Sequence, residues 1–418
     1  MTILPATAPL VARTTEISDP GPLLRLLPER APLAWVRRGE GLVGWGSAAE
    51  LTTSGDGRLD DAQRWWRSLI AGAVVRDEVG LPGCGPVAFG SFAFDSTPGD
   101  SRLIVPEVLV GHRDGRWWVT TMSARGGLPM APALPRRRPP RSPGIVAFAD
   151  GARSGAEWEL IVADAVRRIG RGDLEKVVLA RELVAEAAEP VDLRWPLGRL
   201  ADRYPTCWTF SVAGLIGATP EMLVRLERGL ITSRVLAGTI RRTGDDAHDL
   251  ALAASLARSS KDLEEHEYAV RSVAHALEPH CSSMNVPETP FVLHLANVMH
   301  LATDVTGVIA DGVSSLSLAA ALHPTAAVCG TPTVPALELI RQIEGIDRGR
   351  YAGPVGWIDA AGDGEWGIAL RCAEVDPDVP ARLRLFAGCG VVAGSDPEAE
   401  LAESTAKLVP IRDALAAS

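Results

Sequence analysis

Three lysines are the residues of this sequence with the most distinctive chemistry. Lys176, Lys261 and Lys407 are the only lysines among its 42 basic residues, and all the others are arginines. Arginine stays protonated in proteins, whereas a lysine can lose its proton and act as a base. A GC-rich coding bias accounts for the excess of arginine. It does not explain why each lysine falls beside acidic residues in a segment that resembles a site, so we expect chemistry there.

Two predicted helices carry carboxylates at a spacing that suits a divalent cation. The carboxylates are Asp262 and Glu265 in the helix around 261–279, and Glu400 and Glu403 in the helix 397–416. Residues three apart lie on one face of a helix. Each stripe alone is more often a solvated surface with salt bridges. If the two helices face each other, however, their repulsion favours a cation between them, and Mg²⁺ prefers such oxygen ligands.

Several single residues could also take part in chemistry, although each has a structural explanation. Glu221 follows a proline turn and precedes a strand, where a lone glutamate is usually solvated. Arg371 ends an apolar run that we expect to be a strand, so it either extends to solvent or pairs with a carboxylate. His300 and His323 are by default buried, hydrogen-bonded histidines.

Two glycine-rich runs are candidate anion sites. The run 385–394, which contains Gly388 and Gly390, is expected to form a strand, a glycine-rich turn and a helix. Small residues let backbone N–H groups approach an anion at a helix N-terminus. The run 236–239, which contains Gly238, allows the same interpretation. A plain tight turn explains either run more simply.

The elements that must position these residues indicate a mixed α/β chain. Apolar runs predict strands within 34–36, 85–90, 117–122, 207–212, 223–226 and 382–386, and another strand from Lys176 onward. Helical periodicity predicts helices over 154–170, 246–278, 333–343 and 397–416. Ser154 with Glu157 fits a capping box, and Asp396 with Pro397 fits a helix start. The run 135–143, rich in proline and arginine, is expected to be a solvated loop. Because several strands follow one another across short turns, we expect antiparallel sheets.

The composition excludes several classes of function. The 418 residues carry a formal net charge of −10, which argues against a general nucleic-acid binder. The six cysteines are far apart and form no C-x-x-C motif, which suits free thiols in a reducing cytosol. The first residues lack the features of a signal peptide, and no apolar stretch approaches about 18 residues. We therefore expect a cytoplasmic protein without a membrane span.

Taken together, the order and spacing of the motifs resemble the chorismate-utilising enzymes. This family includes isochorismate synthases, salicylate synthases and the large subunits of anthranilate and aminodeoxychorismate synthases. The resemblance covers about residues 154–413. It rests on G-A-T-P-E at 217–221, L-A-G-T at 236–239, K-D-L-E-E-H at 261–266, N-V-M-H at 297–300, F-A-G-C-G at 386–390 and S-D-P-E-A-E-L-A-E at 395–403.

The resemblance implies an α/β (α+β) fold, with a large antiparallel β-sandwich surrounded by helices. Residues 1–150 would complete this fold, and residues 151–418 would form the chorismate-binding catalytic region. It also implies a Mg²⁺ cofactor. Glu265 and Glu403 match the direct metal ligands of the family, and Asp262 and Glu400 match acidic partners that act through metal-bound water.

Further positions match the catalytic and substrate-binding residues of the family. Lys176 and Glu221 match the catalytic pair. The matching substrate contacts are Gly238, Thr239, His300, Tyr351, Arg371, Gly388, Gly390 and Lys407. Of these, Arg371 with the two glycine amides matches the site of the enolpyruvyl carboxylate, and Lys407 lies near the ring carboxylate. Tyr351 matches a position that varies between subfamilies.

Two positions distinguish the subfamilies. Lys176 matches the lysine of members that use water, where anthranilate synthases carry glutamine. Ala237 stands where aminodeoxychorismate synthases carry a nucleophilic lysine, so no covalent lysine adduct can form here. The run from Leu322 to Pro332 resembles isochorismate synthases, and salicylate synthase remains the alternative. We therefore expect no glutamine amidotransferase subunit. The sequence carries no signal of oligomeric state, and a monomer is the default expectation.

The implied reaction adds water at C2 of chorismate while the C4 hydroxyl leaves, which requires two proton transfers. Lys176 is the expected base and must be partly neutral, and Glu221 is the expected acid and must be partly protonated. The product would enter menaquinone biosynthesis, our preference, or siderophore biosynthesis. The alternative from another class is a catalytically inactive binding homologue.

Overall fold

The computed structural model of the protein describes residues 2–3, 8–96, 99–125, 127, 134, 138–294 and 298–416. Of residues 2, 3, 239, 261 and 265 it describes the backbone alone. The predicted loop 135–143 is therefore described only from residue 138, where it is irregular and mostly exposed. Asn297 of the N-V-M-H motif lies outside the described residues.

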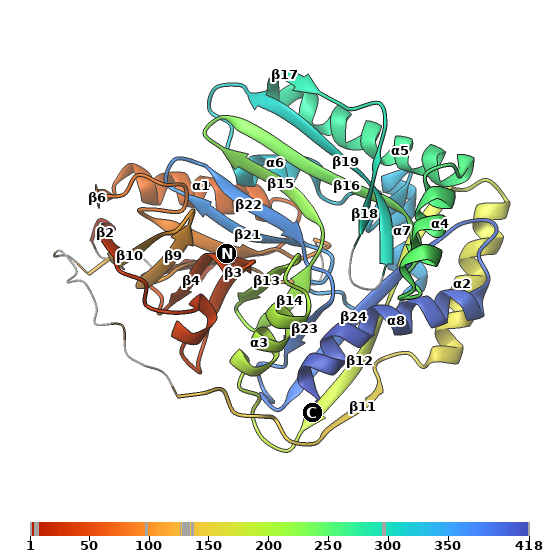
Figure 1. Ribbon diagram of the computed structural model, residues 1–418, viewed down its shortest axis with the longest axis horizontal. Coiled ribbons are helices and arrows are strands. Elements are labelled where there is room, and N and C mark those ends of the chain that lie inside the picture. Colours follow the sequence, from red (N-terminus) through yellow and green to blue (C-terminus); the bar gives the residue numbers. More distant parts are fainter. Residues whose placement is uncertain are drawn as a thin grey trace.

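Two large sheets form the centre of the fold (Figure 1). Within the described residues, the first sheet has 13 strands. In spatial order they are β11 (Val146–Asp150), β12 (Lys176–Ala187), β24 (Arg382–Val391), β23 (Cys372–Val375), β14 (Leu215–Thr219), β13 (Trp208–Val212), β3 (Leu33–Arg37), β4 (Glu40–Trp45), β9 (Val108–Arg113), β10 (Arg116–Ser123), β2 (Val11–Ile17) and β6 (Val74–Asp77), and β20 (Gly330–Thr331) pairs with β12.

The second sheet has 11 strands in the described part of the chain. Their order is β1 (Thr2–Ile3), β5 (Ala49–Thr53), β8 (Ser101–Val105), β7 (Val87–Ser91), β21 (Pro354–Asp359), β22 (Gly364–Ile368), β15 (Met222–Glu227), β16 (Leu230–Arg241), β19 (Val298–Ile309) and β17 (Cys281–Asn285), and β18 (Phe291–His294) pairs with β19. Neighbouring strands are antiparallel throughout the described residues, except that β2 and β6 are parallel. The expected antiparallel α/β sandwich is confirmed.

Helices cover the outer faces of the sheets. They are α1 (Arg58–Ala71), α2 (Gly155–Gly170), α3 (Arg194–Arg203), α4 (Asp246–Leu256), α5 (Ser260–Leu277), α6 (Ser315–Leu322), α7 (Thr333–Ile343) and α8 (Pro397–Leu415), with short 3₁₀ helices η1 (Leu23–Leu26) and η2 (Glu278–His280). Helix α8 packs on β24 and is flanked by α2 and α3, whereas α5 packs on β16 and β19. None of the described helices combines the length and the apolar character needed to cross a membrane.

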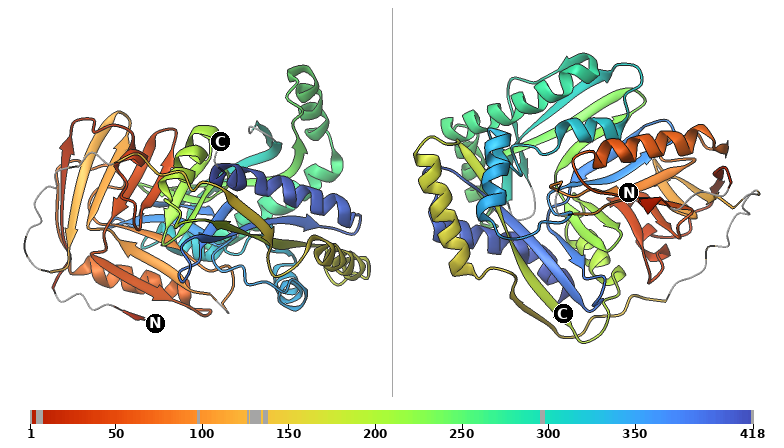
Figure 2. Two further views of the ribbon diagram at one scale, coloured as in Figure 1. Left: turned by 90° about the horizontal axis from the view of Figure 1, so that it is seen from below. Right: turned by 180° about the vertical axis from the view of Figure 1, so that it is seen from behind.

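Strands from both sides of residue 150 share each sheet, and Trp35 links the two sheets. The indole of Trp35 in β3 is 2% exposed and stacks on Trp208. Its Nε1–H donates to Glu365 of β22 in the other sheet, over 2.7 Å. Figure 2 shows the N-terminal strands (red and orange) at one end of the molecule and α2 (yellow) at the other.

Most predicted elements are confirmed, and one helix is divided. The capping box of Ser154 and Glu157 begins α2, and Asp396 caps α8. The predicted helix 246–278 is instead two helices, α4 and α5. The side chain of Ser259 accepts a hydrogen bond from the Asp262 N–H and so starts a second helix, because serine is a strong N-cap. The six cysteines are all free thiols.

Candidate active site

One cavity of about 850 Å³ collects the residues that the sequence analysis singled out. It lies where β12, β24, β16 and β19 approach α5 and α8. The predicted residues that line it are Lys176, Glu221, Gly238, Asp262, His300, Tyr351, Arg371, Gly388, Gly390, Glu400, Glu403 and Lys407. The side chains of Thr239 and Glu265 lie outside the described part of the chain, so their roles stay predictions.

Lys176 is the first residue of β12 and enters the cavity beside β24. A Cβ atom on Gly390 would lie 2.8 Å from Lys176 Cε and 3.4 Å from Nζ. Any larger residue at position 390 would therefore displace the lysine. The glycine provides the space in which the ammonium extends across the strand pair.

Glu221 lies in the short connection between β14 and β15. Its N–H donates to Thr219 Oγ1, and its C=O accepts from the Ile368 N–H, so its backbone is fixed on both sides. Burial raises the pKa of the Glu221 carboxyl to about 7, although the positive charges of Lys407, Lys176 and Arg371 act in the opposite direction. A carboxyl in this environment holds a proton about half of the time at neutral pH. The expectation of a partly protonated Glu221 is therefore supported.

The glycines of F-A-G-C-G do not form the predicted turn, because they continue β24 to Val391. Gly388 pairs with Ala180 of β12, and Gly390 pairs with Val178. The N–H groups of Val178 and Ala180 bond on the far side of β12, to Cys329 and Glu344. Both pairs are thus of the non-hydrogen-bonded kind, so the polar groups of the two glycines point away from β12.

The glycine amides therefore face the side on which β23 ends. The last residue pair of β23 with β24 is Cys372 with Phe386, so no strand of the described residues covers Gly388 and Gly390 on this side. The Gly388 carbonyl oxygen accepts a hydrogen bond from Lys407 there, over 3.0 Å. The amides of Gly388 and Gly390 can therefore be open to an anion, as predicted, although they lie in a strand and not in a turn.

Arg371 also differs from its prediction, because it lies between β22 and β23 and not on a strand. Its φ of 49° is left-handed, which is strained for a side chain other than glycine. This places it just before Cys372, next to the open edge of β24. In the described part of the chain no carboxylate lies within 4 Å of its guanidinium, whose Nη1–H contacts Cys207 Sγ at 3.9 Å. A positive charge without a carboxylate partner suits an anionic ligand.

Gly238 forms a bulge in β16 in place of the expected tight turn. The register against β19 shifts between Ala237 and Thr239, and Gly238 adopts a left-handed φ of 76°. His300 of β19 bonds to the Gly238 backbone. Burial, with help from the charges of Arg371 and Lys407, lowers the pKa of His300 to about 3, so it is neutral at physiological pH. His323 is likewise hydrogen bonded, to the Phe94 carbonyl oxygen at 2.8 Å.

Tyr351 forms another wall of the cavity. Its ring stacks on Phe386 with centroids 5.2 Å apart, and it is 4% exposed. A Cβ atom on Gly388 would lie 3.1 Å from its hydroxyl. The glycine therefore gives space to Tyr351 on one side of β24, as Gly390 does to Lys176.

Carboxylates gather at the start of α8. Cys389, Glu400 and Glu403 place possible ligand atoms within 4.8 Å of one another among the described residues. Burial raises the pKa of Glu400, and so does the negative charge of Glu403, while Ser395 lowers it by hydrogen bonding. Lys407 pairs with Glu403 over 2.7 Å. Two adjacent carboxylates that repel each other are the donor set expected for a hard divalent cation.

Cys389 was not singled out by the sequence analysis, although it lies in the F-A-G-C-G motif. Its thiol is buried and donates to the Glu400 carbonyl oxygen over 3.2 Å. Burial raises the pKa of this thiol, so it stays protonated. We interpret Cys389 as a packing residue that holds the first turn of α8.

Helix α5 brings Asp262 to the cavity from the opposite side. His266, on the next turn, is 2% exposed and bonds through Nε2 to Thr303 Oγ1 at 2.8 Å and through Nδ1 to the Ala237 carbonyl oxygen at 3.3 Å. It therefore anchors α5 to β16 and β19. The predicted pairing of Lys261 with Glu265 concerns side chains outside the described part of the chain.

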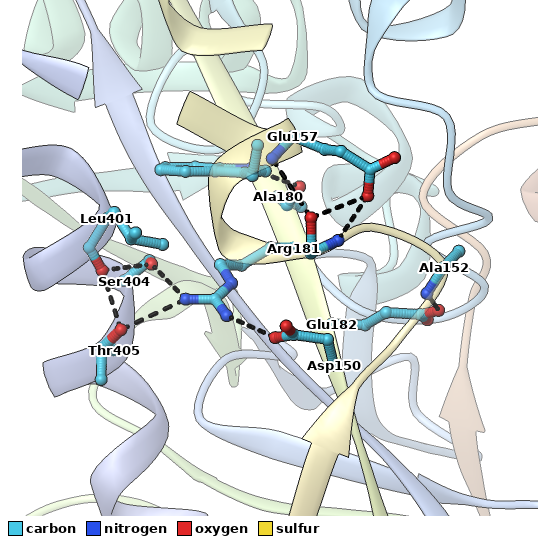
Figure 3. Close-up of polar contacts among 11 residues, drawn as sticks. Asp150, Ala152, Glu157, Ala180, Arg181, Glu182, Leu401, Ser404 and Thr405 are labelled. Carbon is cyan, nitrogen blue, oxygen red and sulfur yellow. Dashed lines mark hydrogen bonds and ion pairs between the residues drawn. The ribbon is translucent and has the colours of Figure 1, made fainter. Parts of the chain in front are cut away.

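Arg181 anchors α8 to β12 from the other face of the strand (Figure 3). The buried guanidinium donates to Ser404 at 3.4 Å and Thr405 at 3.2 Å, both in α8, and pairs with Asp150 at 3.3 Å. These contacts fix α8, which carries Glu400 and Glu403, relative to β12, which begins at Lys176.

Comparison with known proteins agrees with this geometry. The family model "Chorismate binding enzyme" matches residues 29–125 and 136–416. The chain belongs to this family.

Similar proteins include the "Salicylate biosynthesis isochorismate synthase" of Pseudomonas aeruginosa, which is 35% identical over 92% of this chain and 85% of that protein. A "Putative isochorismate synthase MenF" of Mycobacterium tuberculosis is 38% identical over 80% of this chain and 87% of that protein. The solved structure titled "putative 2,3-dihydroxybenzoate-specific isochorismate synthase, DhbC from Bacillus anthracis" has a TM-score of 0.77 at 33% identity, and covers 94% of this chain and 98% of that one.

The space beside Gly390 gives a first prediction. In Gly390→Ala the new methyl group meets the flexible end of Lys176, so the lysine moves and the strand pair stays intact. We expect the turnover of this chorismate-binding enzyme to fall by about 100-fold, the size of effect that a displacement near 1 Å can cause. Turnover with chorismate and thermal unfolding measure the two effects.

The matched control is Gly198→Ala in α3, where a Cβ atom would meet nothing within 4 Å. It should keep full activity and gain about 0.5–1 kcal/mol of stability, since alanine is the better helix former. Wild-type turnover in Gly390→Ala would show that the position of Lys176 does not matter.

The raised pKa of Glu221 gives a second prediction. An unfolded glutamate titrates near 4.5, and the folded one near 7. Between these pH values the wild type loses stability as pH rises, because the folded state binds the proton more tightly than the unfolded state. Glu221→Gln lacks this loss, so its stability relative to the wild type should grow by roughly 3 kcal/mol between pH 4.5 and 7 and then level off.

Urea unfolding of both proteins in the presence of a metal chelator, at a series of pH values, measures this difference. Other titrating groups cancel in the comparison. A stability difference that stays constant across the range would mean that Glu221 titrates like an exposed carboxyl.

Proposed function

We propose that this protein is an isochorismate synthase, which uses Mg²⁺ to convert chorismate reversibly to isochorismate. The observation that carries the proposal is that Lys176 and Glu221 open into one cavity, and that burial holds the pKa of Glu221 near 7. The cavity therefore offers a candidate base together with a candidate acid. The relatives named above carry this activity in their names.

Substrate orientation follows from the charges that line the cavity. Arg371 has no carboxylate partner among the described residues, and the open N–H groups of Gly388 and Gly390 lie beside it. We assign these groups to the enolpyruvyl carboxylate. Lys407, on the carboxylate-bearing helix, is assigned to the ring carboxylate. Gly238, Thr239, the neutral His300 and Tyr351 would complete the contacts to the ring.

The carboxylates fit a magnesium ion. Glu400 and Glu403 lie together on α8, repel each other and face the helix that carries Asp262 and Glu265. We assign Glu265 and Glu403 as direct ligands, and Asp262 and Glu400 as partners through water. Bound there, the ion would neutralise these carboxylates and hold the ring carboxylate of the substrate.

The proton transfers are assigned to two side chains. Lys176 takes a proton from the water that adds at C2, and Glu221 gives a proton to the hydroxyl that leaves C4. Hydroxide is a poor leaving group, so the acid must hold its proton at working pH. Because Glu221 loses its proton above a pH of about 7, forward activity should decline on the alkaline side.

Two residues of the chain also favour isochorismate synthase over the other activities of the family. Lys176 suits water as the nucleophile, and Ala237 excludes a covalent lysine adduct. Salicylate synthase, which also eliminates pyruvate, is the second candidate.

We further propose that residues 1–150 complete one catalytic unit with the rest, and that the enzyme acts in the cytoplasm as a monomer without an amidotransferase. Menaquinone biosynthesis is the preferred pathway, and siderophore biosynthesis is the alternative.

A product assay tests the proposal. Purified protein with chorismate and Mg²⁺ should form isochorismate alone, and chelation of the metal should stop the reaction. Lys176→Arg and Glu221→Gln should each remove activity by a factor of about 1,000 or more without unfolding the protein, because each removes one proton transfer. Salicylate with pyruvate would support the second candidate, and near-wild-type turnover in either variant would refute the assignment of that residue.

The metal assignment has its own test. Glu403→Gln should weaken Mg²⁺ binding by about 10-fold or more, because a charged ligand is lost. Titration calorimetry with Mg²⁺ measures this without reference to turnover. Glu398→Gln, in the first turn of the same helix but outside the cavity lining, is the matched control and should bind Mg²⁺ like the wild type. Equal binding by all three proteins would place the metal elsewhere.

A further inference from the structure

One edge of β12 has a gap in its strand pairing, next to the catalytic lysine. Along this edge β20 pairs with Lys176 and Val177, and β11 pairs from Leu183 onward. Among the described residues no strand pairs with the edge between them. The polar groups of Val178 and Ala180 point into this gap, and buried backbone groups must find partners.

Two side chains fill the gap as a strand would. The Ala180 N–H donates to Glu344 Oε2 over 2.7 Å, and the Val178 carbonyl oxygen accepts from Arg348 Nη2 over 2.7 Å. Glu344 and Arg348 thus supply one acceptor and one donor to alternate residues of β12. The other two polar groups of these residues are also bonded. The Val178 N–H donates to the Cys329 carbonyl oxygen, and the Ala180 carbonyl oxygen accepts from the indole N–H of Trp158.

The pair itself is buried and doubly hydrogen bonded. The side chains of Glu344 and Arg348 are 1% and 4% exposed, and they form two parallel bonds of 2.7 and 2.6 Å. The guanidinium also lies over the ring of Phe94, 4.2 Å from its centroid. Bidentate pairs of this kind fix geometry as well as charge.

The same arginine reaches two further walls of the cavity. Its Nη1–H donates to the Val328 carbonyl oxygen over 2.9 Å, and its own carbonyl oxygen accepts from the Tyr351 N–H over 2.9 Å. Val178, Val328 and Tyr351 all line the cavity. The ion pair therefore joins two separate segments, the start of β12 and the loop before β20, and the backbone of Arg348 adds the turn that carries Tyr351.

We propose that Glu344 and Arg348 are positioning residues of this active site, which fix Lys176 and Tyr351 relative to each other. This inference rests on the proposed function. Arg348 borders the cavity, but its three guanidinium nitrogens bond to Glu344, Val178 and Val328. Neither residue is assigned a contact with the substrate, and they act through the backbone of β12. A buried ion pair is not needed for packing alone, since apolar residues can fill the same space. Its bonds to strand edges give it a geometric role.

The test compares two buried ion pairs. Arg348→Lys keeps the charge but cannot bond to Glu344, Val178 and Val328 together, and Glu344→Gln keeps an acceptor for Ala180 but loses the charge. We expect kcat to fall by about 100-fold in Arg348→Lys and less in Glu344→Gln, while KM changes by only a few-fold. Amide hydrogen exchange at Val178 and Ala180 should become faster in both variants.

The control pair is Asp192 and Arg194, which is also bidentate, with side chains 1% and 8% exposed, and lies outside the cavity lining. Arg194→Lys should lower the melting temperature as much as Arg348→Lys but leave kcat unchanged. If added guanidinium ion partly restores kcat in Arg348→Ala, the loss comes from the missing group and not from unfolding.

Equal kcat in Arg348→Lys and Arg194→Lys would overturn the inference, as would unchanged exchange at Ala180. The product assay on the wild type distinguishes a failure of the positioning role from a failure of the proposed function. If the wild type binds chorismate without turning it over, the proposed function fails, and the comparison is made on the dissociation constant for chorismate. A dissociation constant that rises in the Arg348 variant but not in the control would then still support positioning.

Discussion

The pairing of β12 with β24 is the constraint on which the site depends. It sets Lys176 beside Gly390, and it turns the polar groups of Gly388 and Gly390 toward the open end of β23. A slip of one residue would exchange the two faces of each strand and remove both features. The register is held from outside the pair as well, by Arg181 on the face toward α8 and by Glu344 with Arg348 at the edge.

The charged groups of the cavity change one another's pKa values and must be considered together. Lys176, Arg371 and Lys407 are close enough to oppose the rise in the pKa of Glu221, yet burial outweighs them and keeps that pKa near 7. Arg371 and Lys407 also help burial to keep His300 neutral. A dianionic substrate would find positive charge at Arg371 and Lys407, and a neutral acid at Glu221. The arrangement would offer positive charge to an anion while Glu221 still holds a proton about half of the time at neutral pH.

Much of this could be predicted from the sequence, because local signals and a family resemblance agreed. Capping residues located α2 and α8, and the motifs named the residues that the fold brings to one cavity. The glycines of β24 were misread as a turn, since glycine has the same local signal in a turn and in a strand that needs space. The position of Arg371 and the bulge at Gly238 depend on strand register, which no local pattern specifies. Glu344 and Arg348 drew no attention because they follow the predicted helix 333–343 in a segment without a motif, and only the tertiary fold places a strand edge against them.

In the proposed reaction, water adds at C2 with Lys176 as base and Glu221 as acid, while the C4 hydroxyl leaves. The most direct test is the reaction of chorismate in water labelled with oxygen-18, followed by mass spectrometry of the isochorismate formed at early times. We expect one labelled oxygen, in the C2 hydroxyl of the product. Unlabelled isochorismate would contradict it, because the original hydroxyl would then have moved within the substrate.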